Sequence, residues 1–346
     1  MRHPILAHST MTAPRVRLIS RENGVGLSRD LDLMQRLLAP RFATERVGFG
    51  STGRTRAQVA GLWGRRLLQG RVPLQIFSER VYPRCLPLAE RNFLLPNPEW
   101  FLPRWHPSLA RFDAVLCKTR HAERIFAGLG CTTRFIGFTS EDRLLPDVPR
   151  QRVFFHLAGR SSAKGTRVLL DTWRRHPQWP LLIVVQNPRT AGERVIADNI
   201  DHRIAVLDEA ELRRLQNQCL FHICPSETEG YGHYLMEALS VGAVTLTTDG
   251  EPMNELVTAQ RGLLMLPAQA IKRDLAWRYY VDPAGIELAV TRALRLSDAA
   301  LDAMSRQARE HFVDNQEAFI HRFQRVVTEG LPLQQRSMPA LLRVKE

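Results

Sequence analysis

The sequence has no long apolar run and contains little cysteine and little lysine. No uninterrupted apolar stretch approaches the roughly 20 residues that a membrane-spanning helix needs, so the sequence predicts no such helix. The five cysteines form no CxxC pair, which argues against a disulfide framework or a zinc site. We therefore expect reduced cysteines, largely in the core, at Cys85, Cys117, Cys131, Cys219 and Cys224.

Lysine is scarce among the basic residues: only four of the 48 are lysines, and the formal net charge is +13. An arginine bias follows from genomic base composition as readily as from function, so it is weak evidence for a nucleic-acid partner. The charge still predicts attraction to anionic surfaces, phosphorylated acceptors or acidic lipid headgroups.

Length and composition bound the organisation of the chain. With 346 residues, 44% of them apolar and 24% charged, the chain is long enough for two ordinary globular domains. The first ten residues, MRHPILAHST, are too short and polar for a signal peptide, and Met11 is an alternative start. We expect a cytoplasmic protein, with peripheral contact at the inner face of a membrane as a second option.

The first half predicts an α/β domain over residues 14–145. Short apolar runs predict strands, and apolar-periodic runs predict helices between them. The expected strands are 16–20, 46–50, 74–77, 92–96, 113–119 and 135–138, and the expected helices are 27–38, 62–69 and 121–129. Gly24 and Gly26 separate the first strand from the first helix, where glycine lets a ligand approach the backbone closely.

Other polar residues of this half are weaker candidates. Asp30 and Asp32 invite a metal interpretation, which we reject because helix positions two apart point to different sides. Acceptor contact is a candidate role for Glu79, Arg80 and Trp100, although a surface pair and a packed aromatic explain them equally well. Lys118 ends a predicted strand, where a cation could meet a phosphate.

The second half predicts another α/β domain, over residues 151–315, after a polar linker at 140–151. The expected strands are 153–158, 181–186, 202–207, 219–224, 244–248 and 262–266, and the expected helices are 166–175, 209–216, 233–241, 283–295 and 298–328.

The stretch from Cys224 to Asn254 holds the central motif. A buried strand, a loop with Gly230 and Gly232, a helix and a second strand make a βαβ unit, whose loop is where open α/β sheets bind ligands and where a helix N-terminus favours phosphate. Glu229 lies in the loop and Glu237 lies eight positions later, on the helix. Carboxylates only accept hydrogen bonds, so the pair suits a ligand rich in hydroxyls. A solvated loop glutamate plus a helix-surface glutamate is an equally open interpretation of the pair alone.

A family resemblance strengthens the first interpretation. Ser226 to Gly232, together with Glu237, Ala238 and Leu239, resembles the signature of retaining glycosyltransferases of the GT-B fold. By that resemblance, Glu229 touches donor-sugar hydroxyls and Glu237 binds the nucleotide ribose. The family usually has an aliphatic residue where His233 stands. This departure either places a titratable group beside the donor phosphates or only caps the helix.

A second segment carries the same resemblance. Gly159, Arg160, Lys164 and Gly165 precede a predicted helix, as in the loop that opens the C-terminal domain of these enzymes. In the family the arginine and lysine hold the donor diphosphate, and phosphoryl oxygens do require fixed positive charge near a helix N-terminus.

The resemblance implies a GT-B architecture, with two Rossmann-like parallel-sheet domains that face a central cleft, and a C-terminal segment, 316–346, whose helix returns to the first domain before a flexible tail. It implies a retaining glycosyltransferase that uses a nucleotide diphosphate sugar and needs no metal or other cofactor. The implied catalytic residues are Glu229, Arg160 and Lys164. The implied donor-binding residues are Gly24, Gly26, Arg160, Lys164, Gly230, Tyr231, Gly232, His233, Tyr234 and Glu237.

The acceptor is the open part of this expectation. We expect a glycan or lipid-linked glycan, with a sugar-phosphate synthase or phosphorylase as an alternative. A nucleic-acid-directed transferase fits the charge but lacks a recognised nucleic-acid module. A non-catalytic member of the fold is disfavoured because Arg160, Lys164, Glu229 and Glu237 are all present.

Overall fold

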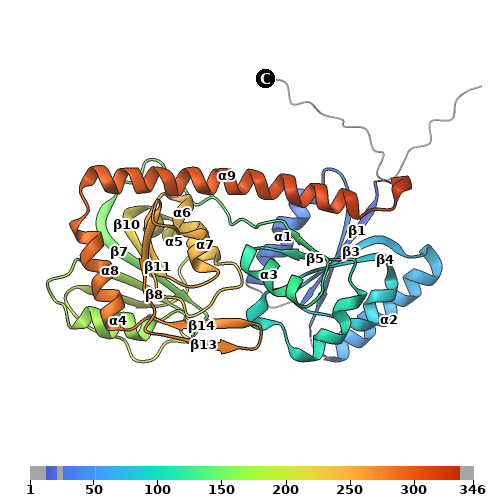
Figure 1. Cartoon of the computed structure of the whole chain (residues 1–346), viewed down its shortest axis with the longest axis horizontal. Helices are drawn as coiled ribbons and strands as arrows, with labels where there is room; N and C mark the ends of the chain where they lie inside the picture. Colours follow the sequence, from blue (N-terminus) through green and yellow to red (C-terminus); the bar gives the residue numbers. More distant parts are fainter. Residues whose placement is uncertain (1–12, 22–25, 51, 336–346) are drawn as a thin grey trace, which may run out of the picture. The chain divides into compact units, whose positions relative to one another are not determined.

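The structure is a computed structural model that describes residues 13–21, 26–50 and 52–335, and the chain divides into two compact units (Figure 1). The first unit contains the described residues up to Pro96, Arg104–Leu116, and the described residues from Phe323 onward. The second unit contains Asn97–Pro103 and Cys117–Arg322. By this division, Asn97–Pro103 and residues 117–145, which the sequence analysis assigned to the first domain, group with the residues of the predicted second domain.

The first sheet has the strand order β2-β1-β3-β4-β5-β6. Its strands are β1 (Arg15–Arg21), β2 (Ala43–Phe49), β3 (Val72–Ser78), β4 (Ala89–Leu95), β5 (Ala114–Cys117) and β6 (Thr133–Phe135). The pairings from β2 across to β5 are parallel. All seven residues of β3 are buried, which is why its sequence, VPLQIFS, is nearly all apolar: a parallel sheet is covered on both faces.

Three helices and three 3₁₀ segments connect these strands. They are α1 (Gly26–Leu38), α2 (Thr52–Gln69), α3 (Arg120–Gly128), η1 (Pro83–Leu88), η2 (Pro98–Trp100) and η3 (Pro103–Arg111). The strand ends at Cys117, two residues before the predicted end at 119, and Thr119 is instead the N-cap of α3: its side chain accepts a hydrogen bond from the Ala122 N–H at 3.0 Å.

The second sheet has the order β12-β11-β10-β7-β8-β9, and its five pairings are all parallel. The strands are β7 (Gln151–Gly159), β8 (Leu182–Gln186), β9 (Ile200–Ile204), β10 (Cys219–Cys224), β11 (Val244–Thr248) and β12 (Gly262–Met265). Chain order reverses between β7 and β10, which lie side by side although their pairing partners Phe155 and His222 are 67 positions apart in sequence.

The core of the second unit follows the alternation of side chains along its strands. Phe154, Leu182 and Val184 pack on one face of the sheet with residues of α4 (Thr166–Arg174) and α8 (Pro283–Arg295). Phe155, next along β7, packs on the other face with Leu215 of α5 (Glu209–Gln218). Neighbours in a strand point to opposite faces, so a continuous apolar run serves both layers.

The remaining helices are α6 (His233–Ser240), α7 (Met253–Leu256), α9 (Asp298–Gly330) and η4 (Leu333–Gln335). From Phe323 onward α9 belongs to the first unit, where Gly330 packs closely on Phe93 and Leu74. Within the described ranges, no helix combines the length and the apolar character that crossing a membrane requires.

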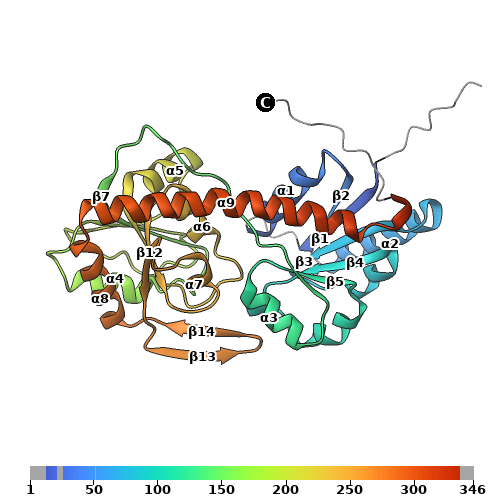
Figure 2. The same cartoon turned by 45° about the horizontal axis from the view of Figure 1, so that its top comes forward.

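The predicted α/β architecture with two parallel sheets is confirmed, but a hairpin was missed. Strands β13 (Gln269–Arg273) and β14 (Ala276–Tyr280) pair antiparallel and lie outside the six-stranded sheet (Figure 2). The segment, QAIKRDLAWRYY, mixes charges with aromatics and lacks a clear two-residue alternation. Asp274, which adopts φ +49°, starts its tight turn without the glycine that usually marks such a turn.

Candidate functional site

The candidate site lies at the carboxyl ends of β7 and β10, where the strand order of the second sheet reverses. The loop after β7 runs through Gly159–Gly165, and the loop after β10 leads to α6 at His233. Ligands of open α/β sheets bind at such a reversal, so the two predicted motifs meet at the expected place.

Lys164 and Glu229 form an ion pair that joins the two loops. Their side chains are only 14% and 12% exposed. The Lys164 ammonium also lies 3.8 Å from the centre of the Tyr234 ring. Ser226 donates a hydrogen bond to Glu229 at 2.6 Å, and its hydroxyl is 2.5 Å from that of Tyr234. These four residues form one half-buried polar cluster at the start of α6.

The hydroxyl of Tyr234 acts in this cluster as a neutral group. Burial raises the pKa of Tyr234 well above its usual value, so the hydroxyl stays protonated. The sequence predicted Tyr234 as a donor-binding residue but gave no sign that its ring would lie against Lys164.

Two close backbone contacts fix the position of the loops. A β-carbon at Gly165 would lie 2.3 Å from the Pro225 carbonyl oxygen, and Gly165 has φ +64°. The Glu227 N–H donates to the Ala163 carbonyl at 3.0 Å. Only glycine satisfies both the conformation and the space at position 165.

We predict that Gly165→Ala displaces the Lys164 loop and lowers the free energy of unfolding. Gly159→Ala is the matched control, because Gly159 also has a positive φ (+58°) but has no atom within 4 Å of a built β-carbon. The control should lose about 1–2 kcal/mol from the left-handed conformation alone, and Gly165→Ala should lose clearly more. Denaturant unfolding measures both, and equal losses would refute the packing argument.

His156 of β7 makes hydrogen bonds next to both loops and was not identified from the sequence. Burial lowers the pKa of His156 to about 4, so the ring is neutral at pH 7. Its Nδ1 lies 2.8 Å from the Ile223 carbonyl, which can only accept, so Nδ1 carries the proton. Nε2 then accepts from the Thr166 hydroxyl at 2.9 Å. One neutral ring thus ties β7 to β10 and to the first residue of α4.

Glu237 is not a surface residue. It is 5% exposed, and one of its carboxylate oxygens accepts a hydrogen bond from Gln216 Nε2 at 2.9 Å. Gln216 in turn accepts from the Arg143 guanidinium at 2.8 Å, and Arg143 forms an ion pair with Glu209. The helix-surface alternative for Glu237 is therefore wrong, because neighbouring side chains hold the carboxylate.

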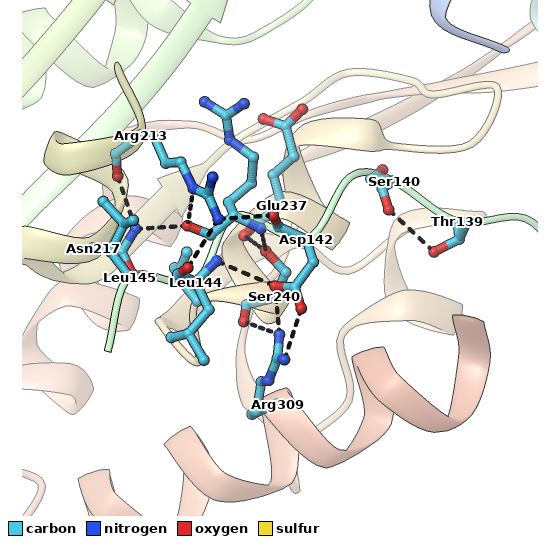
Figure 3. Close-up of polar contacts among 12 residues, drawn as sticks. Thr139, Ser140, Asp142, Leu144, Leu145, Arg213, Asn217, Glu237, Ser240 and Arg309 are labelled. Atoms are coloured by element: carbon cyan, nitrogen blue, oxygen red, sulfur yellow. Dashed lines mark hydrogen bonds and ion pairs between the residues drawn. The ribbon is translucent and has the colours of Figure 1, made fainter. Parts of the chain in front are cut away.

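Within the second unit, polar contacts hold the segment around Arg143 in place (Figure 3). Arg309 of α9 contacts both carboxylate oxygens of Asp142, at 2.6 and 2.7 Å. Arg213 donates to the carbonyls of Arg143 and Leu144, each at 2.9 Å. Burial raises the pKa of Asp142, but hydrogen bonds and the charge of Arg309 outweigh burial and hold that pKa below its usual value. The predicted linker at 140–151 is thus held in place over its first part.

His233 and Tyr231 occupy the start of α6. Gly232, with φ +103°, is the N-cap residue of the helix. His233 Nδ1 lies 2.8 Å from Ser140 Oγ. Tyr231 is buried, and its hydroxyl donates to the Phe138 carbonyl at 2.5 Å, so its ring takes part in packing. The contact with Ser140 holds the His233 ring at the N-terminus of α6.

Gly230 is in close contact with residues from the η2 turn. A β-carbon at Gly230 would lie 2.4 Å from Glu99 Oε1 and 2.5 Å from Asn97 Cγ. The sequence analysis named Trp100 as a candidate, but it could not show that the turn before it touches the glycine loop.

The remaining predicted residues are Gly24, Gly26, Arg160 and Lys118. Gly24 lies outside the described residues, and Gly26 begins α1 in the first unit. Arg160 is exposed, and within the described ranges it has no ion-pair partner. Lys118 is 3% exposed, with its ammonium 4.6 Å from the centre of the Phe138 ring.

Of three further carboxylates, Glu255 and Asp32 have partners that the sequence did not reveal. Glu79, in the first unit, adopts φ +59°. Glu255 accepts the backbone N–H groups of Arg120, at 2.8 Å, and His121, at 2.5 Å, and so caps α3. Asp32 pairs with Arg46, and over the described ranges no group of three or more His, Cys, Asp or Glu side chains is arranged to hold a metal ion.

A protein-family match covers the residues that form the candidate site. The glycosyl transferases group 1 family matches residues 151–278, which include both loops of the site. No curated protein matches the sequence.

Similar solved structures share the whole fold at low identity. A glycosyltransferase from Rickettsia africae ESF-5 is 11% identical, with a TM-score of 0.68 over 92% of this chain and 98% of that one. Alr3699/HepE of Anabaena, in complex with UDP and glucose, is 13% identical, with a TM-score of 0.61 over 91% and 98%. The GtfA/B complex is 14% identical, with a TM-score of 0.59; the match covers 78% of this chain and only 60% of that one.

At such identities the structural likeness establishes the fold, and the family match concerns the second unit. The two parallel six-stranded sheets are those of the GT-B fold. Residues 151–278 therefore form a domain that matches the glycosyl transferases group 1 family, within a chain that has the GT-B fold.

Proposed function

We propose that this protein transfers a sugar from a nucleotide diphosphate sugar to a hydroxyl of a glycan or lipid-linked glycan, with retention of the anomeric configuration. The observation that carries the proposal is the Lys164–Glu229 pair at the N-terminus of α6, with Arg160 on the same loop as Lys164. It brings fixed positive charge and a hydroxyl-binding carboxylate to one point.

Positive charge serves the departing diphosphate. An ammonium has three donors, so Lys164 can keep its bond to Glu229 and still donate to a phosphate oxygen. The exposed guanidinium of Arg160 is a bidentate hydrogen-bond donor. The backbone N–H groups of the first turn of α6, after Gly232, are further donors for a phosphate. Charge develops on the phosphate as the bond to the sugar breaks, so these donors stabilise the transition state more than the ground state.

The proposed reaction breaks the bond between the anomeric carbon and the phosphate oxygen and forms a bond from that carbon to the acceptor oxygen. The acceptor proton passes to the departing phosphate oxygen. Glu229 then positions the donor sugar by accepting from its hydroxyls, and Glu237, held by Gln216, accepts from the ribose. Because side chains and helix N–H groups supply the positive charge, we expect the reaction to proceed without a metal ion.

We predict that a nucleotide sugar raises the melting temperature of the purified protein. A ligand present at 100 times its Kd, bound only to the native state, adds about 2.7 kcal/mol, which amounts to a rise of roughly 5–10 °C for a domain of this size. UDP-sugars are the first to test, because the similar Anabaena protein was solved with UDP and glucose. GDP-, ADP- and dTDP-sugars complete the panel.

Absence of a shift with every nucleotide sugar would contradict the proposed donor site. Where a shift is found, the same donor incubated with and without candidate acceptors separates transfer from binding. Analysis of the product anomer then tests retention, and a free sugar phosphate as the acceptor tests the synthase alternative.

A further inference from the structure

The β13–β14 hairpin is attached directly to the loop after β10, which borders the candidate site, and to the loop after β11. The Tyr279 N–H donates to the Glu227 carbonyl at 2.8 Å, two residues before Glu229. The Tyr279 ring fills the space above Gly250, where a β-carbon would lie 2.5 Å from it. Arg278 pairs with the Glu227 carboxylate at 3.5 Å. The base of the hairpin is therefore fixed to the loops after β10 and β11.

One face of the hairpin carries an exposed aromatic and a cation. The antiparallel register places Lys272 opposite Trp277 and Ala270 opposite Tyr279. Side chains alternate along a strand, so Trp277 and Tyr279 share a face with Lys272. Trp277 is 41% exposed, and Lys272 and Arg273 are exposed. Within the part of the chain that the structure describes, neither cation has an ion-pair partner.

A second exposed tryptophan lies on the turn that contacts this hairpin. Trp100 is 57% exposed and ends η2, which packs against β14 within the second unit. The preceding residues Asn97 and Glu99 contact Gly230 of the glycine loop. Contacts thus link the glycine loop to Glu99, and link the η2 turn, which ends at Trp100, to the hairpin that carries Trp277.

We propose that Trp100, Trp277 and Lys272 form an acceptor-binding surface for an acidic oligosaccharide. The inference rests on the proposed function, which gives the Glu229 loop to the donor sugar and so puts this surface beside the point of transfer. Flat rings suit the apolar faces of sugar rings, and grouped exposed aromatics are typical of binding surfaces.

Charge selects the class of oligosaccharide. Among residues 269–280 there are three cations and one acid, and only Arg278 of the cations is paired with a carboxylate. Uronate carboxylates or phosphate groups on the acceptor would meet Lys272, which shares a face with Trp277.

The test is calorimetric titration of the full-length protein with hexagalacturonate, with maltohexaose of equal length as the neutral probe. We expect the wild type to bind hexagalacturonate and to bind maltohexaose at least tenfold more weakly. Trp277→Ala, Trp100→Ala and Lys272→Glu should each weaken hexagalacturonate binding about tenfold, as truncation of a central aromatic or charged contact does. Arg167→Ala on α4 and Leu288→Ala on α8, both exposed in the same unit, should leave binding unchanged.

Several outcomes overturn the inference. They are no binding of hexagalacturonate by the wild type, equal binding of maltohexaose, insensitivity to both tryptophan variants, and tighter binding of a six-nucleotide single-stranded DNA through the same residues. Failure of the proposed function is seen separately, as an absence of stabilisation by nucleotide sugars. Trp277→Ala should retain that stabilisation, since Trp277 is outside the donor cluster.

Discussion

Replacing Lys164 with alanine is expected to lower turnover by about 100- to 1,000-fold, the loss measured when one charge-stabilising donor is removed from other active sites. Lys164 is the cation nearest to the start of α6 that also contacts Glu229 and the Tyr234 ring. Its removal takes away positive charge where the leaving phosphate forms. Initial rates of sugar transfer at saturating donor measure the effect.

Arg167→Ala is the control for this variant, because Arg167 is three residues away and 96% exposed. Its turnover should remain within a factor of two of the wild type. The variant Glu229→Gln keeps the shape of the side chain but weakens its contacts, and should raise KM or lower kcat while the melting temperature stays near that of the wild type. Unchanged turnover in Lys164→Ala would mean that the diphosphate binds elsewhere.

Replacing Glu237 with alanine is expected to weaken nucleotide-sugar binding about 10- to 150-fold, because hydrogen bonds to a charged group contribute roughly 1.5–3 kcal/mol. The carboxylate is 5% exposed and is oriented by Gln216, so it is already aligned before a ligand arrives. Titration calorimetry with the nucleotide sugar identified by thermal stabilisation measures the loss.

Glu237→Gln separates binding from stability. Its amide oxygen can still accept from Gln216, so unfolding should change little while the charge toward the ribose is lost. Glu310→Ala, an exposed carboxylate on α9, is the surface control. If the alanine and glutamine variants bind the donor as tightly as the wild type, Glu237 has a structural role only.

Strands and helices were largely predictable because the local pattern of apolar residues reflects which positions are buried. The run CLFHIC predicted β10 to the residue, since a strand buried on both faces needs only apolar continuity. The β13–β14 hairpin was not predictable in this way: Tyr279 is placed by Gly250 and Glu227, which are remote in sequence. A hairpin held by contacts with other loops needs no strong pattern of its own.

The site was predictable where spacing carried it and not where packing did. Glu229, Glu237, Arg160 and Lys164 were proposed from two motifs, and in the structure Lys164 forms an ion pair with Glu229. Nothing in the sequence linked Gln216 to Glu237, or His156 to the Thr166 hydroxyl, because each contact joins elements that meet only in the folded sheet. The capping of α3 by Glu255 likewise depends on residues more than 130 positions away in sequence.

The place of Gly330 in the first unit has a consequence for synthesis of the protein. Leu74 and Phe93 lie in strands made early, yet they pack against a helix end that leaves the ribosome about 240 residues after Phe93. This part of the first unit's apolar surface is therefore covered only after α9 has been made, when most of the second unit can already have folded. A nascent chain halted at Arg322 would expose the surface around Leu74 and Phe93. Chaperones that recognise apolar segments would then bind the first unit, which is synthesised first.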